Sequence, residues 1–395
     1  MLKGKTIILG ITGSIAAYKI CNLASMLVKL NADVHVIMTK NATNFVNPIT
    51  FETLTKNKCL VDTFDRNFEF KVEHVSLAKK ADLFLVAPAS ANVIGKIASG
   101  ICDDMLTTTL FAFTKAKLIA PAMNTNMYNN PILQDNLTKL KNYGYEIVEP
   151  KNGVLACGDL GVGKLEDENK LLDRILYHLL YNHDLTGKKV LITAGPTKEA
   201  IDPVRYITNH SSGKMGFSIA NKAYLRGADV TVVSSINDLK LYDDINLVNI
   251  SSANDMYEVI KKTYSEYDYI IMAAAVADYT PIEYVDTKIK KTDNDMSLSL
   301  KRTNDILKFL GENKKNNQKI IGFSMETENL IENSKKKLDK KNADMICANT
   351  IGSNKTGFKA DTNQITLITK NETVELPFDT KDNLANMILD KIITL

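Results

Sequence analysis

Short apolar runs alternate with segments of helical periodicity along this chain, and the alternation stops near residue 187 and then begins again. In the first half, the runs "KTIILGI", "DVHVIMT", "DLFLVAPAS" and "KLIAPAMN" are separated by helical patterns, the longest over residues 91–113. Strands that are apolar on both faces and joined by helices predict a parallel sheet covered on both sides. After the polar stretch "YNHDLTGKK", "KVLITAGPT" opens a second series of the same kind.

We therefore predict an α/β protein with two Rossmann-like three-layer domains, residues 1–187 and 188–395, whose sheets are mostly parallel. A chain of 395 residues exceeds the size of one ordinary core, which agrees with two domains. In the second domain, "NQITLITKNETVELPF" predicts a hairpin, and a closing helix is expected from about Thr380. Ligands of such sheets bind beyond the carboxyl ends of the strands, so the loops at those ends carry the argument about function.

The amino-acid composition limits the classes of binding partner and the cellular compartment that we expect for this protein. The net charge of +3 is small, so no nucleic acid or other acidic polymer is implied. The five cysteines form no C-x-x-C pair, which favours reduced thiols in a cytoplasmic protein over a disulfide framework. The first apolar run is too short to span a membrane and is more typical of a buried strand than of a signal peptide, so we expect no membrane association.

Three strand ends of the first half carry groups that suit a phosphate. Gly13 permits close backbone approach and Ser14 can cap a helix, Thr39 ends the second strand, and residues 90–92 begin another helix. Together they suggest one phosphate-bearing cofactor, although each alone is equally well explained by a tight turn or a cap. A G-x-G-x-x-G fingerprint and an acidic residue after the second strand are both missing from the sequence, which disfavours NAD.

The stretch "ACGDLGVGK" is open to two interpretations. From Gly158 it spells G-x-x-x-x-G-K, but Leu165 stands where a P-loop needs Ser or Thr for magnesium, and only a weak strand precedes it. Alternatively, Cys157 is a reactive thiol on a glycine-rich flap or a buried structural cysteine. Taken alone, His74 before a helix is more typical of a structural or exposed histidine, whereas Asn124 after an apolar strand fits a helix cap and a functional role equally well.

The order of several motifs points to a family. "GSIAAYK", "EHVSLAKKAD", "APASANVIGK", "PAMN" and "ACGDLGVGKL" follow one another in the first half and closely resemble the homo-oligomeric FMN-dependent cysteine decarboxylases. The second half supplies "TAGPTKEAIDPVRYITNHSSGKMG", "AAAVADY", "KIKK" and "GFSMET". Over essentially its whole length the chain resembles the bifunctional phosphopantothenoylcysteine decarboxylase / phosphopantothenate–cysteine ligase family of coenzyme A biosynthesis.

The resemblance implies roles for residues of the first half. His74 matches a catalytic histidine that assists deprotonation or oxidation of the substrate thiol, Asn124 an asparagine that holds the substrate carboxylate, and Cys157 a cysteine that donates a proton. The cofactor would be FMN, which oxidises the thiol so that the carboxylate can leave. On this interpretation the P-loop spelling is a coincidence. The residues matching the FMN site are Gly13, Ser14, Ile15, Thr39, Ser90, Ala91, Asn92 and Val93.

For the second half, the resemblance implies that CTP activates 4'-phosphopantothenate as an acyl-cytidylate, which cysteine then attacks. Asn209 would stabilise that intermediate, Lys288 would neutralise charge on the transferring phosphates, and Asp278 is a candidate ligand of Mg²⁺ bound with CTP. Taken alone, "KKKLDKK" would be a solvated helix face, "KIKK" a polar loop and Asn209 part of a capped turn. The residues matching the CTP site are Asp278, Lys288, Thr303, Asn304, Asp305, Ile306, Phe323, Lys337 and Lys341.

Two positions depart from the family pattern. Thr303 begins "TNDI" where the family usually has Asn-Pro-Asp-Ile. The loss of the proline changes the stiffness of this loop, so the affinity for CTP and the selectivity over other nucleotides are expected to differ from the family pattern. Asp104 stands where relatives often carry Asn, and the sequence gives no account of the added charge.

The resemblance also implies trimeric decarboxylase units and dimeric ligase units, hence a large homo-oligomer such as a dodecamer. Two other functions fit the pattern of elements: an NAD(P)- or flavin-dependent oxidoreductase with two Rossmann-like domains, and a flavin-binding oligomer whose second domain only binds a nucleotide. A flavin spectrum and pyrophosphate release that requires CTP would separate them.

Overall fold

The computed structural model describes residues 1–64, 73–291, 296–326, 328–350 and 360–395, and it divides into two compact units, Met1–Tyr181 and Asn182–Leu395. The boundary expected near Gly187 lies shortly after this division. Residues just before Gly187 are bound to the second unit, because Asp184 pairs with Arg226 at 2.6 Å and the Leu185 N–H donates to the Arg226 carbonyl at 2.9 Å.

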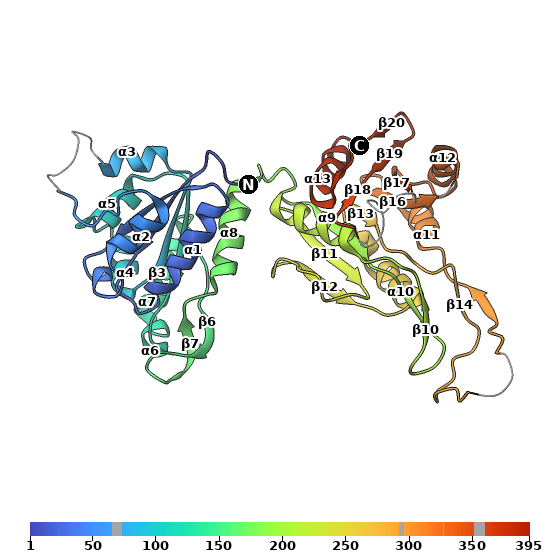
Figure 1. Ribbon diagram of the computed structural model, residues 1–395, viewed down its shortest axis with the longest axis horizontal. Coiled ribbons are helices and arrows are strands. Elements are labelled where there is room, and N and C mark those ends of the chain that lie inside the picture. The colour runs from blue at the N-terminus through green and yellow to red at the C-terminus, as the bar shows by residue number, and fades with distance from the viewer. Residues whose placement is uncertain (65–72, 292–295, 327, 351–359) are drawn as a thin grey trace. The chain divides into compact units, whose positions relative to one another are not determined.

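Unit 1 is a sheet of parallel strands in the order β2-β1-β3-β4-β5, with helices on its faces (Figure 1). A short hairpin, β6–β7, lies outside this sheet. The elements are β1 (Thr6–Ile11), α1 (Ala17–Lys29), β2 (Asp33–Met38), η1 (Ala42–Asn44), α2 (Pro48–Thr55), α3 (Glu73–Lys80), β3 (Leu83–Ala89), α4 (Ala91–Ser99), α5 (Met105–Ala112), β4 (Ala116–Pro121), α6 (Thr125–Tyr128), α7 (Pro131–Asn142), β5 (Glu146–Ile147), β6 (Lys151–Val154), β7 (Leu160–Lys164) and α8 (Glu168–Leu180).

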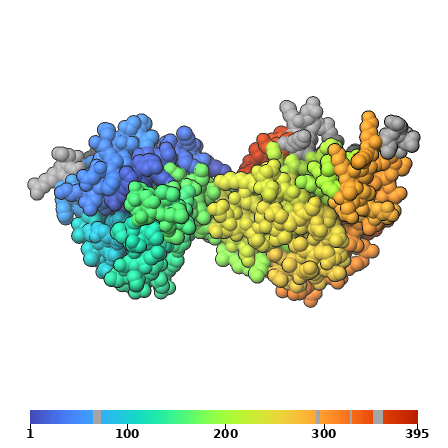
Figure 2. Space-filling view, turned by 90° about the horizontal axis from the view of Figure 1, so that it is seen from below, coloured from blue at the N-terminus to red at the C-terminus, as the bar shows by residue number. Residues whose placement is uncertain are grey.

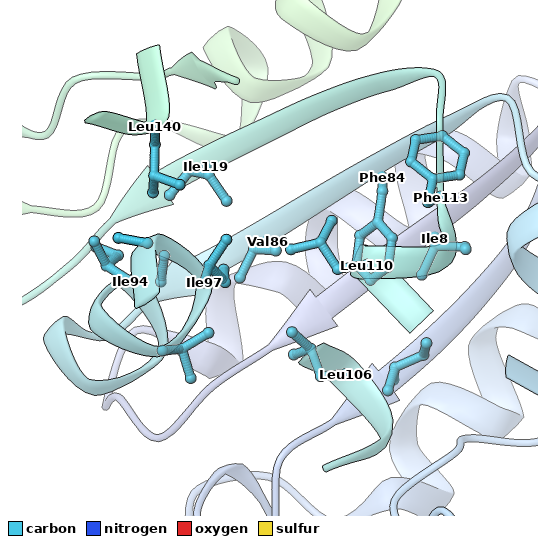
Figure 3. Close-up of a cluster of buried hydrophobic side chains, with 14 of the residues drawn as sticks. Ile8, Phe84, Val86, Ile94, Ile97, Leu106, Leu110, Phe113, Ile119 and Leu140 are labelled. Atoms are coloured by element: carbon cyan, nitrogen blue, oxygen red, sulfur yellow. The ribbon is translucent and has the colours of Figure 1, made fainter. Parts of the chain in front are cut away.

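One face of this sheet packs on α4, α5 and α7 through an apolar core (Figure 3). Ile8, Phe84 and Ile119 come from three neighbouring strands and are fully buried. The ring of Phe84 meets that of Phe113 edge-on, with centroids 6.0 Å apart. Burial of each such side chain stabilises the fold by about 1.5–3 kcal/mol, so this core holds the strands β1, β3 and β4 in fixed positions.

The helical pattern over residues 91–113 is two helices rather than one. α4 ends at Gly100, whose φ of 76° is left-handed and favours glycine. α5 starts at Asp104, whose carboxylate accepts the Thr107 N–H at 2.8 Å in a capping box. Asp104 also lies 3.4 Å from Lys96 Nζ. The carboxylate of Asp104, which the sequence left unexplained, therefore caps α5, and Lys96 balances its negative charge.

Unit 2 is a sheet in the order β12-β11-β8-β13-β16-β17-β19-β20, parallel from β12 through β17 and antiparallel beyond. The predicted hairpin is confirmed as β19–β20, and the closing helix begins after its N-cap, Thr380. The elements are β8 (Lys189–Ala194), β9 (Lys198–Ala200), β10 (Tyr206–Thr208), α9 (Lys214–Leu225), β11 (Asp229–Ser234), β12 (Asn246–Asn249), α10 (Ala253–Thr263), η2 (Tyr264–Glu266), β13 (Tyr269–Met272), β14 (Tyr279–Pro281), β15 (Leu300–Arg302), α11 (Ile306–Asn313), β16 (Lys319–Glu326), α12 (Leu330–Lys340), β17 (Met345–Thr350), β18 (Thr362–Asn363), β19 (Ile365–Thr369), β20 (Thr373–Glu375), β21 (Asp379–Thr380) and α13 (Lys381–Ile393).

The antiparallel pair β14–β15 lies outside this sheet and forms an arm that projects from the body of unit 2 (Figure 1). In the space-filling view the arm stands out in orange from the rest of its unit (Figure 2). Among the residues that the structure describes, no helix is both long and apolar enough to cross a membrane.

Candidate active sites in the two units

The predicted cofactor residues of unit 1 converge at one edge of its sheet. Gly13 to Ile15 follow β1, Thr39 follows β2, and Ser90 to Val93 follow β3. Because β2, β1 and β3 are adjacent and parallel, their carboxyl ends meet at the same edge. The fold thus brings together three loops that are far apart in the sequence.

This edge fits a polar, phosphate-bearing group. The Thr39 hydroxyl is buried and, among the described residues, makes no hydrogen bond, which is costly unless a ligand supplies one. A Cβ atom at Gly13 would lie only 2.8 Å from Asn41 Cβ, so glycine keeps the backbone close at this turn. Ser90 caps α4, whose free N–H groups face the same edge.

The sequence did not single out Thr12, which joins two of these loops. Its fully buried hydroxyl donates to the Pro88 carbonyl at 2.6 Å and accepts the Ser90 N–H at 2.9 Å. Thr12 therefore fixes the end of β1 against the end of β3. A threonine placed directly after a buried strand was the signal available in the sequence.

Asn124 and Cys157, for which the family resemblance implies two separate roles in decarboxylation, lie side by side. The Asn124 amide Nδ2 is 3.4 Å from Cys157 Sγ and donates to Asp159 Oδ2 at 3.0 Å, while Cys157 Sγ donates to the same oxygen at 3.3 Å. Asn124 is the N-cap of α6, and Cys157 lies in the turn of the β6–β7 hairpin. Both line a pocket of about 440 Å³.

Asp159, which holds both groups, is a functional candidate that the sequence analysis missed, although it stands only two residues after Cys157. Its carbonyl also accepts the Leu155 N–H at 2.9 Å, so it closes the hairpin turn as well. A carboxylate that accepts from both an amide and a thiol fixes their orientation in the pocket.

Glycines let the hairpin approach the body of unit 1. A Cβ atom at Gly161 would collide with the side chain of Thr125, and the Met123 N–H donates to the Gly163 carbonyl at 2.9 Å. The segment from Gly158 to Lys164 thus forms a turn and a strand, with no helix start after the glycines. This geometry excludes the P-loop interpretation, which requires a strand–loop–helix.

His74 is not brought to this pocket. It lies half-buried near the start of α3 and is not among the described residues that line the space around Asn124 and Cys157. A single chain therefore assembles only two of the three predicted decarboxylase residues.

In unit 2 a pocket of about 520 Å³ lies at the ends of β13, β15 and β16. All the residues expected for CTP except Lys288 line it, which is the densest convergence of predicted residues in the described structure. Those residues are Asp278, Thr303, Asn304, Asp305, Ile306, Phe323, Lys337 and Lys341.

Two lysines of "KKKLDKK" turn into this pocket rather than into solvent. Lys337 Nζ donates to the Phe323 carbonyl at 2.9 Å, and Lys341 forms an ion pair with Asp305. Burial opposes ionisation of Asp305, but hydrogen bonds from Lys341 and the Lys308 N–H outweigh it and lower the pKa of the carboxyl. The solvated-face interpretation holds for the exposed Lys335, Lys336 and Lys340 only.

Thr303 explains how "TNDI" is held without the proline of the family. Its hydroxyl donates to the Ala277 carbonyl at 2.7 Å, and its N–H donates to the Asp278 carbonyl at 3.0 Å. Two bonds therefore fasten the loop after β15 to the segment that follows β13. Asp305 then caps α11 by accepting the Lys308 N–H at 3.0 Å.

Asn209 lines an adjoining pocket of about 460 Å³ that shares Asp278, Phe323 and Lys337 with the first. Its amide donates to the Ala275 carbonyl at 3.1 Å, which holds it against the segment after β13. Lys214 and Lys381, which the sequence analysis did not select, line the same space. Burial and then the nearby Lys214 lower the pKa of Lys381.

Lys288 lies exposed on the loop after β14, outside both pockets. The loop is nevertheless held, since Ile289 N–H donates to Asp202 Oδ2 at 3.2 Å and Arg205 Nη2 donates to the Ile289 carbonyl at 2.7 Å. Asp202 is 2% exposed. Burial disfavours its charge, yet hydrogen bonds from Arg205 and from backbone N–H groups keep its pKa below the ordinary value.

The described residues contain no group of three or more His, Cys, Asp or Glu side chains arranged for a metal ion. Asp278, the expected magnesium ligand, is an exposed carboxylate in the pocket wall. A metal here would need phosphate oxygens as further ligands, as Mg²⁺ bound with nucleotides commonly has.

Comparisons with known proteins agree with this division. Residues 1–180 match the family model described as Flavoprotein, and residues 185–395 match the DNA/pantothenate metabolism flavoprotein C-terminal domain. The chain is 45% identical to the coenzyme A biosynthesis bifunctional protein CoaBC of Bacillus subtilis, over 100% of this chain and 98% of that protein. It is 44% identical to the protein of the same name from Borreliella burgdorferi, over 98% and 99%.

Two solved structures are similar to one half of the chain each. The C-terminal domain of a coenzyme A biosynthesis bifunctional protein CoaBC is 44% identical, with a TM-score of 0.45, and covers 53% of this chain and 95% of its own. The FMN-dependent cysteine decarboxylase SpaF is 31% identical, with a TM-score of 0.39, and covers 44% of this chain and 95% of its own.

Proposed function

The chain belongs to the family of bifunctional coenzyme A biosynthesis proteins, which combines phosphopantothenoylcysteine decarboxylase and phosphopantothenate–cysteine ligase activities, and we propose that the two units divide these activities between them. Unit 1 would decarboxylate and unit 2 would ligate. One observation carries this proposal: residues that were expected to bind CTP line one pocket, and the adjoining pocket holds Asn209.

In unit 2 the carboxylate of 4'-phosphopantothenate attacks the α-phosphate of CTP and pyrophosphate leaves, after which the amine of cysteine displaces CMP. Lys337 and Lys341 hold the nucleotide in the larger pocket, together with Thr303, Asn304, Ile306 and Phe323. The Asn209 amide donates to the acyl-cytidylate in the adjoining pocket. Lys288 reaches the transferring phosphates from its loop, and Asp278 would be the carboxylate that holds Mg²⁺, which would neutralise part of their charge.

In unit 1 the loops of Gly13 to Ile15, Thr39 and Ser90 to Val93 hold FMN. When bound, FMN supplies the oxidation of the substrate thiol that makes loss of the carboxylate feasible. The Asn124 amide binds the substrate carboxylate, and Asp159 orients that amide. His74 takes the proton of the substrate thiol. Cys157 donates a proton from its thiol to the decarboxylated enethiol, which becomes the saturated thiol as it takes back the electron pair lost in the oxidation.

The same proposal includes a homo-oligomer with trimeric first units and dimeric second units. The absence of His74 from the pocket of Asn124 and Cys157 supports it, because a second copy is the simplest source of the missing imidazole. Exposed apolar residues of the arm in unit 2, including Tyr279, Ile282 and Leu300, suit a contact with another copy.

Two assays on the full-length protein test the proposal. CTP, phosphopantothenate and cysteine together should release pyrophosphate, and phosphopantothenoylcysteine should release carbon dioxide from protein with a flavin spectrum. Mixing His74→Asn with Asn124→Asp chains should restore part of the carbon dioxide release if copies share a site, whereas two inactive variants that stay inactive together would contradict a shared site. The oxidoreductase alternative is not favoured, since the relatives are decarboxylase–ligase proteins.

A further inference from the structure

Two lysines are among the residues that line the mainly apolar pocket of Asn124 and Cys157. Lys19 enters from α1 and Lys164 from β7, whereas Ile15, Val154 and Leu155 are among the apolar residues around them. Both lysines are partly buried. An ammonium group that is partly removed from water normally has an anionic partner.

Neither ammonium group has a hydrogen bond or an ion pair within the part of the chain that the structure describes. Their neighbour Lys151, opposite Lys164 on the hairpin, does form an ion pair with Asp167. After the Lys151 hydrogen bond, Lys19 and Lys164 also lower the pKa of the Asp167 carboxyl, so both are close to the same carboxylate. The two lysines therefore share one neighbourhood.

Room for Lys164 is built into the hairpin. A Cβ atom at Gly153 would lie 3.5 Å from Lys164 Cδ and 4.0 Å from its Nζ, so the lysine stem crosses the facing strand at a glycine. Lys164 is at the same time one of the residues that line the pocket of Asn124 and Cys157.

The proposed substrate has two anionic ends. Its carboxylate is assigned to Asn124, which leaves the phosphate monoester at the far end and, between the two ends, an arm of methylene and dimethyl groups interrupted by a hydroxyl and two amides. Two ammonium groups on different elements match the charge of such a phosphate, and a mainly apolar lining with a few polar groups matches such an arm.

We infer that Lys19 and Lys164 form a phosphate-monoester subsite for the far end of phosphopantothenoylcysteine, an inference that rests on the decarboxylase function proposed for unit 1. The phosphate joins the hairpin, through Lys164, to the body of the unit, through Lys19. Binding of one end of the substrate thus holds the hairpin that carries Cys157 over the reacting end. A substrate without phosphate lacks this link.

FMN also carries a phosphate monoester, and Lys19 follows Ser14 and Ile15 closely, so the test must separate the two phosphates. Lys19→Gln, Lys164→Gln and the control Lys151→Gln are compared as full-length holoenzymes. Carbon dioxide release is measured with phosphopantothenoylcysteine and with pantothenoylcysteine, and FMN content and FMN Kd are measured by absorbance and fluorescence titration.

The unmutated enzyme should favour the phosphorylated substrate in kcat/KM by about tenfold or more. Lys19→Gln and Lys164→Gln should lose most of this preference while keeping their rate on pantothenoylcysteine and their FMN. Lys151→Gln should keep the preference, and Lys164→Arg should largely restore it.

Equal losses on both substrates would overturn the inference, because the lysines would then be structural. A rise in the FMN Kd of Lys19→Gln would assign the subsite to the flavin phosphate and overturn it too. If the unmutated enzyme releases carbon dioxide from neither compound, the decarboxylase function itself fails; if it uses both equally, only the subsite does.

Discussion

The pockets of the two units are formed in different ways. In unit 2 the walls are the ends of the sheet strands β13 and β16 together with the loop after β15, which bonds from Thr303 to Ala277 and Asp278 fasten to the segment after β13. In unit 1 the pocket depends on a hairpin outside the main sheet, held by glycine contacts and by the side chains of Asn124, Cys157 and Asp159.

This difference bears on how each site responds to change. A wall made of strand ends is supported by the core of its unit, so substitutions there should alter ligand contacts without moving the wall. A hairpin reaches its position through few contacts, so single groups at its tip should matter most. We therefore expect the largest effects in unit 1 and the smallest in the cross-linked wall of unit 2.

The largest expected effect is at the tip of the hairpin. Cys157→Ser should lower formation of the decarboxylated thiol product by about 10²–10⁴-fold, because a hydroxyl is a far weaker proton donor than a thiol. Carbon dioxide should still be released, and the oxidised enethiol should accumulate, as mass spectrometry of the products would show. Cys102→Ser, at the other exposed thiol of the described residues, is the control and should be normal. Normal turnover by Cys157→Ser would remove Cys157 from the mechanism.

Next in size is the loss of Lys288 in unit 2. Lys288→Gln should reduce pyrophosphate release by about 10²-fold, since its charge is proposed to balance the transferring phosphates. Lys290→Gln on the same loop is the matched control. Carbon dioxide release from phosphopantothenoylcysteine should be unchanged in both variants, because the units are separately compact. Unaltered pyrophosphate release would show that "KIKK" is only a polar loop.

These cases also indicate what the sequence can predict. Alternating apolar strands were enough to predict two α/β units, and adjacent parallel strand ends explain why Thr39 and Ser90 meet. Local patterns could not place His74 away from Asn124, because that separation depends on the whole fold. Gly100 and Asp104, by contrast, are local signals for a helix end and a helix start, and they are sufficient to divide residues 91–113 into two helices. Asp159 and Asp202 went unnoticed because their importance arises from bonds to groups that only folding brings near.

A smaller effect is expected on the stability of unit 1 at acidic pH, where a change at Glu146 should affect unit 1 and not unit 2. Burial disfavours the charge of Glu146, but hydrogen bonds from His178 at 2.6 Å and from Arg174 lower the pKa of its carboxyl to about 2. A lowered pKa stabilises the fold above the unfolded value near 4.5 and loses that contribution as pH falls toward 2. Near neutral pH, Glu146→Gln should destabilise unit 1 by about 2 kcal/mol.

The rise in fluorescence as FMN is released from the unfolding protein would report on unit 1 alone. This is needed because the two units need not unfold together. The difference between Glu146→Gln and the unmutated protein should shrink as pH is lowered from 4.5 to 2. Glu332→Gln in unit 2, at an exposed pair with Lys336, should leave unit 1 unchanged at every pH. A difference for Glu146→Gln that does not depend on pH would mean that shape rather than charge is responsible.

The smallest expected effect tests the cross-linked wall itself. Thr303→Val keeps the shape of the side chain but removes the bond to the buried Ala277 carbonyl, whose net value is about 1 kcal/mol, or roughly fivefold. Because the Thr303 N–H still holds the Asp278 carbonyl, the wall should loosen rather than collapse, and the KM for CTP should rise a few-fold with little change in kcat. Thr303→Ser retains the hydroxyl and should behave normally. A loss in Thr303→Val as large as that in Lys288→Gln would show that the wall of unit 2 depends on single contacts as much as the hairpin of unit 1 does, and the contrast between the two units would disappear.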